Sequence, residues 1–320
     1  MALMGCSSSD QVVARVNGED LNASVLMRDV EAIQTAIESD TDAALEAYMQ
    51  DTGTTVDEWW NGLIEYYAKE MCVTQKCDEL GITVSDDELE DGISQLESYM
   101  GISTDEELAE YYEGNGLTEE EFKAGCTYSI LQQKLYAQEV DHPEATDELI
   151  QEYGNTYYAS YASTRSSYIY FADGSYDEAY KVLNELKENP KADFAEYAKK
   201  YSQDETSAEN GGDIGWTLLF NGMPSAYSEV LDELEVGEIY DELVVIDDGY
   251  YIIKMTDSYV PTVDDGGTLD LTKMPTELYE QLEQDTNDYL YQVACDNYVD
   301  DLYDAADIEI LVSSYYDLKK

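Results

Sequence analysis

The sequence predicts an α+β protein. A mostly helical N-terminal domain, completed by the C-terminal helix, carries a smaller inserted α+β domain. Two observations predict this fold class: capped acidic helix starts recur through the first half, and strand-like runs alternate with helix-like runs between about residues 161 and 260. A length of 320 residues, 43% of them apolar, is enough for two domains that each have a core.

The chain begins its patterned part at Val12 with a short strand-like run. Asn17-Gly18 follows, a pair that favours a tight turn because both residues tolerate positive φ. A helix is expected next, with Asn22 or Ser24 as its N-cap.

A long helix is predicted over about residues 56–80. It starts at Thr54 or Thr55 and ends at Gly81, since glycine suits the left-handed residue after a helix. Three shorter acidic helices should follow, opened by Ser85, Thr104 and Thr118. Each cap is followed three residues later by a glutamate, the spacing of a capping box.

The second half alternates between strand and helix patterns. Its expected elements are a helix from 147, a strand at 166–171, helices at 176–186 and 192–201, a glycine-bearing loop at 202–216, a helix at 225–234 and a strand at 242–255. A final long helix, about 275–305, leads into the strand-like run 308–312. This order predicts a small α+β domain followed by a returning C-terminal helix.

Composition excludes several classes of function. The formal net charge of −56 repels phosphate backbones and anionic lipid headgroups, which argues against nucleic acid as a partner. The five cysteines show no metal-binding spacing, and His142 is the single histidine, so neither a zinc site nor a histidine-centred triad is expected. No run approaches the roughly 20 apolar residues of a membrane span. The negative net charge of the protein is explained by a solvated acidic surface or, alternatively, by a role in attracting basic unfolded chains.

Three glycines surround one aspartate in the run Tyr201-Ser-Gln-Asp-Glu-Thr-Ser-Ala-Glu-Asn-Gly-Gly-Asp-Ile-Gly-Trp216. These glycines indicate a tight turn, because glycine adopts backbone conformations that residues with a Cβ disfavour. Together with Gly237-Glu-Ile and Asp248-Gly-Tyr-Tyr-Ile-Ile-Lys254, this run resembles the parvulin (PpiC-type) family of peptidyl-prolyl isomerases.

The first half carries a second resemblance. Val16-Asn-Gly-Glu, a long helix, Leu80-Gly-Ile-Thr-Val-Ser-Asp-Asp-Glu-Leu and two shorter helices occur in an order similar to the N-terminal domain of PrsA- and SurA-type secretion foldases. The resemblance implies a tether at 1–10, a helical chaperone-like domain at 11–160 completed by 268–320, and a parvulin-like domain at 161–260. It also implies unfolded secreted proteins as clients.

The parvulin resemblance implies a site without metal or cofactor. Asp204 stands where parvulins keep a cysteine or aspartate, and Met223 and Tyr227 match the methionine and the ring of the proline pocket. Tyr168 and Tyr251 occupy the positions of the two usual histidines. Catalysis of X–Pro rotation requires an apolar bed and a fixed polar network rather than covalent chemistry.

The two tyrosines weaken the inference of activity. A phenol has a pKa near 10 and lacks the two ring nitrogens through which histidine spans a polar chain. Losing 3 kcal/mol of transition-state preference slows a reaction by more than about a hundredfold. Two hypotheses therefore remain: an isomerase of weakened activity, and a catalytically inactive parvulin-fold chaperone. A third, a cation-binding envelope protein, rests on charge alone.

The N-terminus suggests where the protein is located. Leu3-Met-Gly-Cys6 resembles a bacterial lipobox, whose cysteine is lipidated, and serines follow it as a tether. The resemblance implies an extracytoplasmic protein anchored through Cys6 to the outer face of the bacterial cell membrane. The alternative is a free exposed thiol on a flexible tail. The oligomeric state is left open, a homodimer included.

Overall fold

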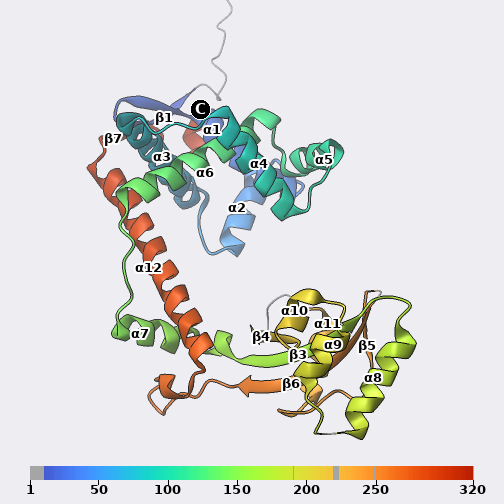
Figure 1. Cartoon of the computed structure of the whole chain (residues 1–320). Helices are drawn as coiled ribbons and strands as arrows, with labels where there is room; N and C mark the ends of the chain where they lie inside the picture. The colour runs from blue at the N-terminus through green and yellow to red at the C-terminus, as the bar shows by residue number, and fades with distance from the viewer. Residues whose placement is uncertain (1–10, 190, 219–222, 248, 320) are drawn as a thin grey trace, which may run out of the picture. The chain divides into compact units, whose positions relative to one another are not determined.

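The computed structural model describes residues 11–189, 191–218, 223–247 and 249–319 (Figure 1). They form two compact units. The first comprises the described residues of Met1–Pro143 and Tyr291–Lys320, and the second those of Glu144–Leu290. The predicted α+β class is confirmed. The predicted domain boundaries, 11–160 with 268–320 and 161–260, stay a prediction.

A small sheet joins the two ends of the chain in the first unit. Its strands lie in the order β2 (Glu19–Asn22), β1 (Val12–Val16) and β7 (Ile308–Ile310), with Ala14 opposite Ile310. The predicted Asn17-Gly18 turn is confirmed, with φ values of 52° and 88°.

Six helices lie in the N-terminal part of the first unit: α1 (Ala23–Ala36), α2 (Asp42–Asp51), α3 (Val56–Leu80), α4 (Asp86–Met100), α5 (Asp105–Asn115) and α6 (Glu119–Glu139). The predicted capping boxes at Ser85 and Thr118 are confirmed, as is Gly81 after α3 with a φ of 69°. Asn22 is the N-cap of α1, although its side chain makes no capping hydrogen bond. The sequence analysis missed α2, which buries only Leu45 and Met49 and therefore shows a weak apolar pattern.

Trp60 on α3 fixes the C-terminal segment to the core of the first unit. Its side chain is fully buried, and its Nε1 donates to the carbonyl of Val312 at 3.0 Å. The ring of Tyr315 lies 5.8 Å away. The returning tail is thus held by a buried aromatic contact as well as by pairing of β7 with β1.

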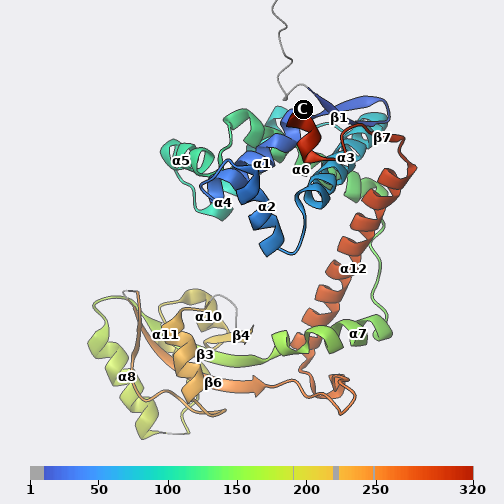
Figure 2. The ribbon, with the colours of Figure 1, turned by 180° about the vertical axis from the view of Figure 1, so that it is seen from behind.

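A four-stranded antiparallel sheet forms the centre of the second unit (Figure 2). Its order is β4 (Asp213–Leu218), β3 (Ser163–Phe171), β6 (Gly249–Tyr259) and β5 (Val244–Ile246). The helices of this unit are α7 (Asp147–Tyr157), α8 (Tyr176–Glu188), α9 (Phe194–Tyr201), α10 (Glu205–Glu209), α11 (Ser225–Glu233) and the first part of α12 (Thr276–Ala305), which ends in the first unit.

Each face of this sheet is covered by different helices. Ile169, Phe171 and Ile252 pack with α8 and α9 on one face. Tyr168 and Ile253, which stand opposite each other on β3 and β6, pack with α11 on the other. Side chains alternate along a strand, so a single register assigns residues to the two faces. The candidate site lies on the α11 face.

Two predicted elements of this unit are wrong. The expected loop 202–216 contains the short helix α10 and most of β4. β4 pairs with β3 across a register shift between Arg165 and Ser167, and the extra β4 residues there include Gly215, with a φ of 75°. The expected strand 242–255 is a hairpin of β5 and β6, in which Asp247 adopts a φ of 50°. Residue 248 lies outside the described residues.

Within the part of the chain that the structure describes, no helix has both the length and the apolar character needed to cross a membrane. Cys6, the predicted lipidation site, lies outside the described residues.

Candidate functional site

Strands β3 and β6 bring two of the predicted site residues together. Tyr168 and Tyr251 meet edge to face, with ring centroids 5.3 Å apart and ring planes at 72°. Tyr227 of α11 approaches Tyr168 in the same manner, at 6.3 Å and 83°. Such edge-to-face pairs are favourable beyond the area they bury. The three rings form a fixed aromatic cluster on one face of the sheet.

Asp204 completes a hydrogen-bonded network with this cluster. It is the N-cap of α10, and its carboxylate accepts from the hydroxyl of Tyr168 at 2.5 Å and from that of Ser207 at 2.6 Å. The backbone amides of Thr206 and Ser207 donate to the same carboxylate at 3.2 and 3.4 Å. Four donors on one carboxylate hold it in place and favour its charged form.

These hydrogen bonds determine the charge states of Asp204 and Tyr168. The hydroxyls of Ser207 and Tyr168 lower the pKa of Asp204 below its usual range. Burial, assisted by the hydrogen bond to Asp204, raises the pKa of Tyr168 to about 12. Near neutral pH, Asp204 is therefore an anion and Tyr168 a neutral donor. Neither group changes its charge in that range.

Tyr227 and Met223 lie beside the network in an apolar cluster. The side chain of Tyr227 is only 2% exposed, and its hydroxyl lies 3.0 Å from that of Ser166. Burial raises the pKa of this phenol. Met223 is half-buried against the same cluster, which also contains Ile253 and Met255. Together these side chains form an apolar surface next to the Tyr168–Asp204 hydrogen bond.

All five residues that the sequence analysis assigned to the central domain are therefore brought together: Asp204, Tyr168, Tyr251, Met223 and Tyr227. The arrangement offers a fixed anion, a neutral hydroxyl and apolar side chains. It is suited to bind and orient a ligand non-covalently.

Sequence reasoning missed two serines that support this site. Ser207 bonds Asp204 and is 5% exposed, and its position three residues after an N-cap aspartate is the signal that could have found it. Ser166 bonds Tyr227 and is fully buried, a polar residue within a buried strand run. A buried hydroxyl requires a partner, which is the general reason to look for one in such a run.

The glycine-bearing turn is fixed by an ion pair that the sequence did not indicate. Asp213 accepts from the amide of Gly215 at 3.0 Å, as expected of an aspartate that holds a turn. It also faces the guanidinium of Arg165, whose Nη2 and Nε donate to it at 2.7 and 3.2 Å. Arg165 lowers the pKa of Asp213. This pair joins β3 and β4 at the bulge and so fixes the strand that carries Tyr168.

Two family models match the chain. Residues 2–115 match the SurA-like N-terminal domain, and residues 172–257 match the PPIC-type PPIASE domain. The foldase protein PrsA of Geobacillus sp. (strain WCH70) is 30% identical over 211 residues, which span 65% of this chain and 70% of the relative. PrsA of Caldanaerobacter subterraneus is 27% identical over 261 residues, 79% of this chain and 78% of the relative. A crystal structure of PrsA from Bacillus subtilis aligns over 95% of both chains, with 24% identity and a TM-score of 0.37.

Proposed function

Because the chain belongs to the PrsA family of foldases and contains a PPIC-type domain, we propose that it binds unfolded secreted proteins and weakly accelerates the rotation of their X–Pro bonds. The observation that carries this proposal is the convergence of Asp204, Tyr168 and Tyr251 beside Met223 and Tyr227. The barrier to X–Pro rotation is near 20 kcal/mol, and twisting the amide breaks its resonance without any covalent step.

Met223 and Tyr227 would form the bed for the proline ring. An apolar bed removes water from the amide, and a catalyst gains only where it favours the twisted state over both planar states. The polar groups that could favour that state are the hydroxyls of Tyr168 and Tyr251 and the fixed charge of Asp204. The hydroxyl of Tyr168 already donates to Asp204 at 2.5 Å, so its single proton is committed within the protein. That the proton of Tyr168 is already donated to Asp204 supports a weakened isomerase activity.

The alternative is an inactive parvulin-fold chaperone, in which the same apolar surface binds proline-bearing segments without catalysis. The observation that favours it is again the committed Tyr168 proton. The two functions differ only in whether rotation is faster in the bound state, so a rate measurement separates them.

A protease-coupled proline-peptide assay tests the proposal. We expect a rate above background but about a hundredfold below that of a histidine-bearing parvulin. Asp204→Ala and Met223→Ala should each abolish it, and Tyr168→His/Tyr251→His should raise it. The wild-type rate should be flat between about pH 6 and 8, whereas that of the double variant should change near the histidine pKa of about 6.5, because only the variant titrates in that range.

Tyr250→His is the matched control, because Tyr250 lies next to Tyr251 on β6 but packs on the α8 face. It should leave the rate unchanged. A wild-type rate equal to that of a histidine-bearing parvulin would overturn the claim of weakened activity. No rate in the wild type, together with suppressed aggregation of an unfolded client, would leave the chaperone alternative.

We further propose an extracytoplasmic location with lipid attachment at Cys6. The lipobox-like Leu3-Met-Gly-Cys6 and the family membership support it. Expression in a Gram-positive host with a labelled fatty acid should give a labelled protein. Cys6→Ser should abolish the label, and persistence of the label in that variant would contradict the proposal.

A further inference from the structure

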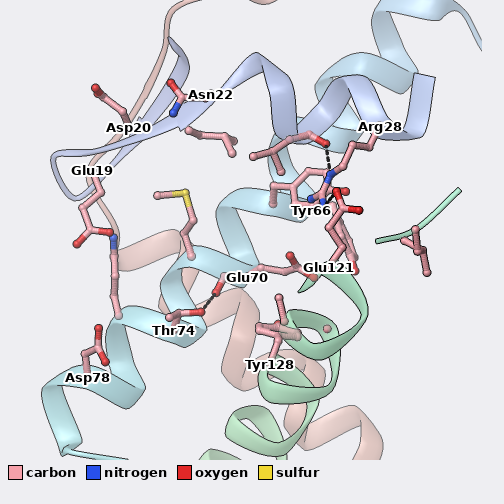
Figure 3. Close-up of a pocket in the computed structure, with 18 residues that line it drawn as sticks. Glu19, Asp20, Asn22, Arg28, Tyr66, Glu70, Thr74, Asp78, Glu121 and Tyr128 are labelled. Atoms are coloured by element: carbon pink, nitrogen blue, oxygen red, sulfur yellow. Dashed lines mark hydrogen bonds and ion pairs between the residues drawn. The ribbon is translucent and has the colours of Figure 1, made fainter. Parts of the chain in front are cut away.

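A groove runs along helices α3 and α6 in the first unit. Its first hollow, of 560 Å³, is bounded by β2, α1, α3 and α6, and its second, of 790 Å³, by α3, α4, α5 and α6. The two hollows share Tyr66, Glu70, Leu117, Glu121, Gly125 and Tyr128 in their walls, so we treat them as one continuous cavity, the α3–α6 groove. In Figure 3 the labelled side chains of Tyr66 and Glu70 from α3 and of Glu121 and Tyr128 from α6 lie around the first hollow.

The first hollow carries an excess of negative charge. Five carboxylates line it, from Glu19, Asp20, Glu70, Asp78 and Glu121. Against them stands one guanidinium, that of Arg28, which already pairs with Glu121 at 3.2 Å. Asp20 pairs with an arginine outside the lining. Among the described residues, Glu19, Glu70 and Asp78 have no lysine or arginine within ion-pair distance.

Glu70 stands at the junction of the two hollows among aromatic rings. Tyr66 and Tyr67 meet edge to face at 5.1 Å beside it, and Tyr128 faces the same space from α6. The hydroxyl of Tyr67 is committed to Asp29 at 2.6 Å, which fixes that ring. Burial raises the pKa of Glu70, and a hydrogen bond from Tyr66 and the charge of Arg28 offset part of this effect. A cation placed there would meet both a carboxylate and aromatic faces.

The second hollow differs in chemistry. Among the described residues of its walls, only the shared Glu70 and Glu121 carry a charge. Large apolar groups line it, among them Leu96, Phe122, Ile130 and Tyr111. A ligand that fills both hollows must therefore present a positive group to one and an apolar group to the other.

We propose that the α3–α6 groove binds an extended segment of a client chain in which a lysine or arginine stands beside a large apolar residue. The basic side chain enters the acidic, tyrosine-lined hollow and the apolar one enters the neighbouring hollow. Charge complementarity selects this occupant: five carboxylates and one guanidinium line the first hollow, so a cationic side chain is attracted there and an acidic segment is repelled. The inference rests on the proposed client-binding function and adds to it a site and a sequence preference.

The test uses the full chain and a short labelled glycine–serine peptide that carries one phenylalanine–lysine pair and no proline. Fluorescence anisotropy should show saturable binding. Acetylation of the lysine should weaken binding about fivefold or more, as should Glu70→Gln in the protein, because each removes one partner of a partly buried ion pair. Replacing the phenylalanine with alanine should weaken it by a similar factor through the second hollow.

Glu120→Gln is the matched control, since Glu120 lies on α6 and is exposed but does not line the groove. It removes the same charge and should change the affinity less than twofold. Equal affinity for the lysine and acetyl-lysine peptides overturns the proposal without relying on any variant. So does equal affinity of Glu70→Gln and wild type, or competition by putrescine as effective as that by the unlabelled peptide. Because the peptide lacks proline, binding here and the isomerase rate can fail independently.

Discussion

We expect Gly212→Ala to destabilise the second unit by roughly 2–5 kcal/mol. Gly212 has a φ of 81°, and a left-handed residue with a Cβ costs about 1–2 kcal/mol. A Cβ here would also lie 2.3 Å from the carbonyl oxygen of Tyr168 and 3.1 Å from the Cβ of Ala198, and such overpacking costs about 1–3 kcal/mol more. The carbonyl cannot easily retreat, because it belongs to the central strand β3.

Gly215→Ala is the matched control for this substitution. Gly215 has a similar φ of 75°, but nothing lies within 4 Å of a Cβ built there. It should lose only the conformational part, about 1–2 kcal/mol. The free energies are read from hydrogen exchange of the β3 and β6 amides in increasing denaturant. Equal losses in the two variants would show that the contact with Tyr168 is unimportant.

Trp60→Ala should cost the first unit about 3–5 kcal/mol through the cavity it leaves. The side chain is fully buried, and its loss also leaves the carbonyl of Val312 without its donor. An unpaired buried carbonyl adds about 1–3 kcal/mol. Hydrogen exchange of β7 should rise most, because Trp60 ties the tail that follows β7 to α3.

Two further variants separate these contributions. Trp60→Phe keeps most of the ring but removes the indole donor, so its loss should be smaller and confined to the tail. Trp59→Ala changes the neighbouring, half-buried ring and should cost less than Trp60→Ala. If Trp59→Ala and Trp60→Ala were equally destabilising, burial and the bond to Val312 would not be what stabilises the tail.

Local signals in the sequence predicted most of the helices. The capping boxes at Ser85 and Thr118 and the glycine at 81 act within a few residues of the helix ends they define, so the sequence alone locates them. Strands depend on partners far along the chain. The sequence predicts a loop where β4 lies, because the pairing of β4 with β3 requires a bulge around Gly215. It predicts one strand in place of β5 and β6, because only two residues separate Ile246 from Gly249.

The residues of the candidate site were predictable through a family resemblance. The residues that hold them in place were not. Asp204, Met223 and Tyr227 stood in recognisable motifs. No local pattern could name the partners of Ser166 and Arg165, because Tyr227 and Asp213 lie far along the chain. The α3–α6 groove was missed for the same reason: its walls come from the β1–β2 hairpin and from helices whose individual patterns are those of ordinary acidic helices.

The pairing of β1 with β7 sets an order on folding. The second unit is one continuous stretch of chain, so all its contacts are available once residue 290 has been synthesised or translocated. The first unit must wait for Ile308–Ile310 to reach β1, a contact of nearly maximal sequence separation, and such contacts form slowly. Until then one edge of β1 is unpaired, and an open edge can pair with another chain. In a protein whose relatives are foldases, it is thus the first unit that is exposed to misfolding longest.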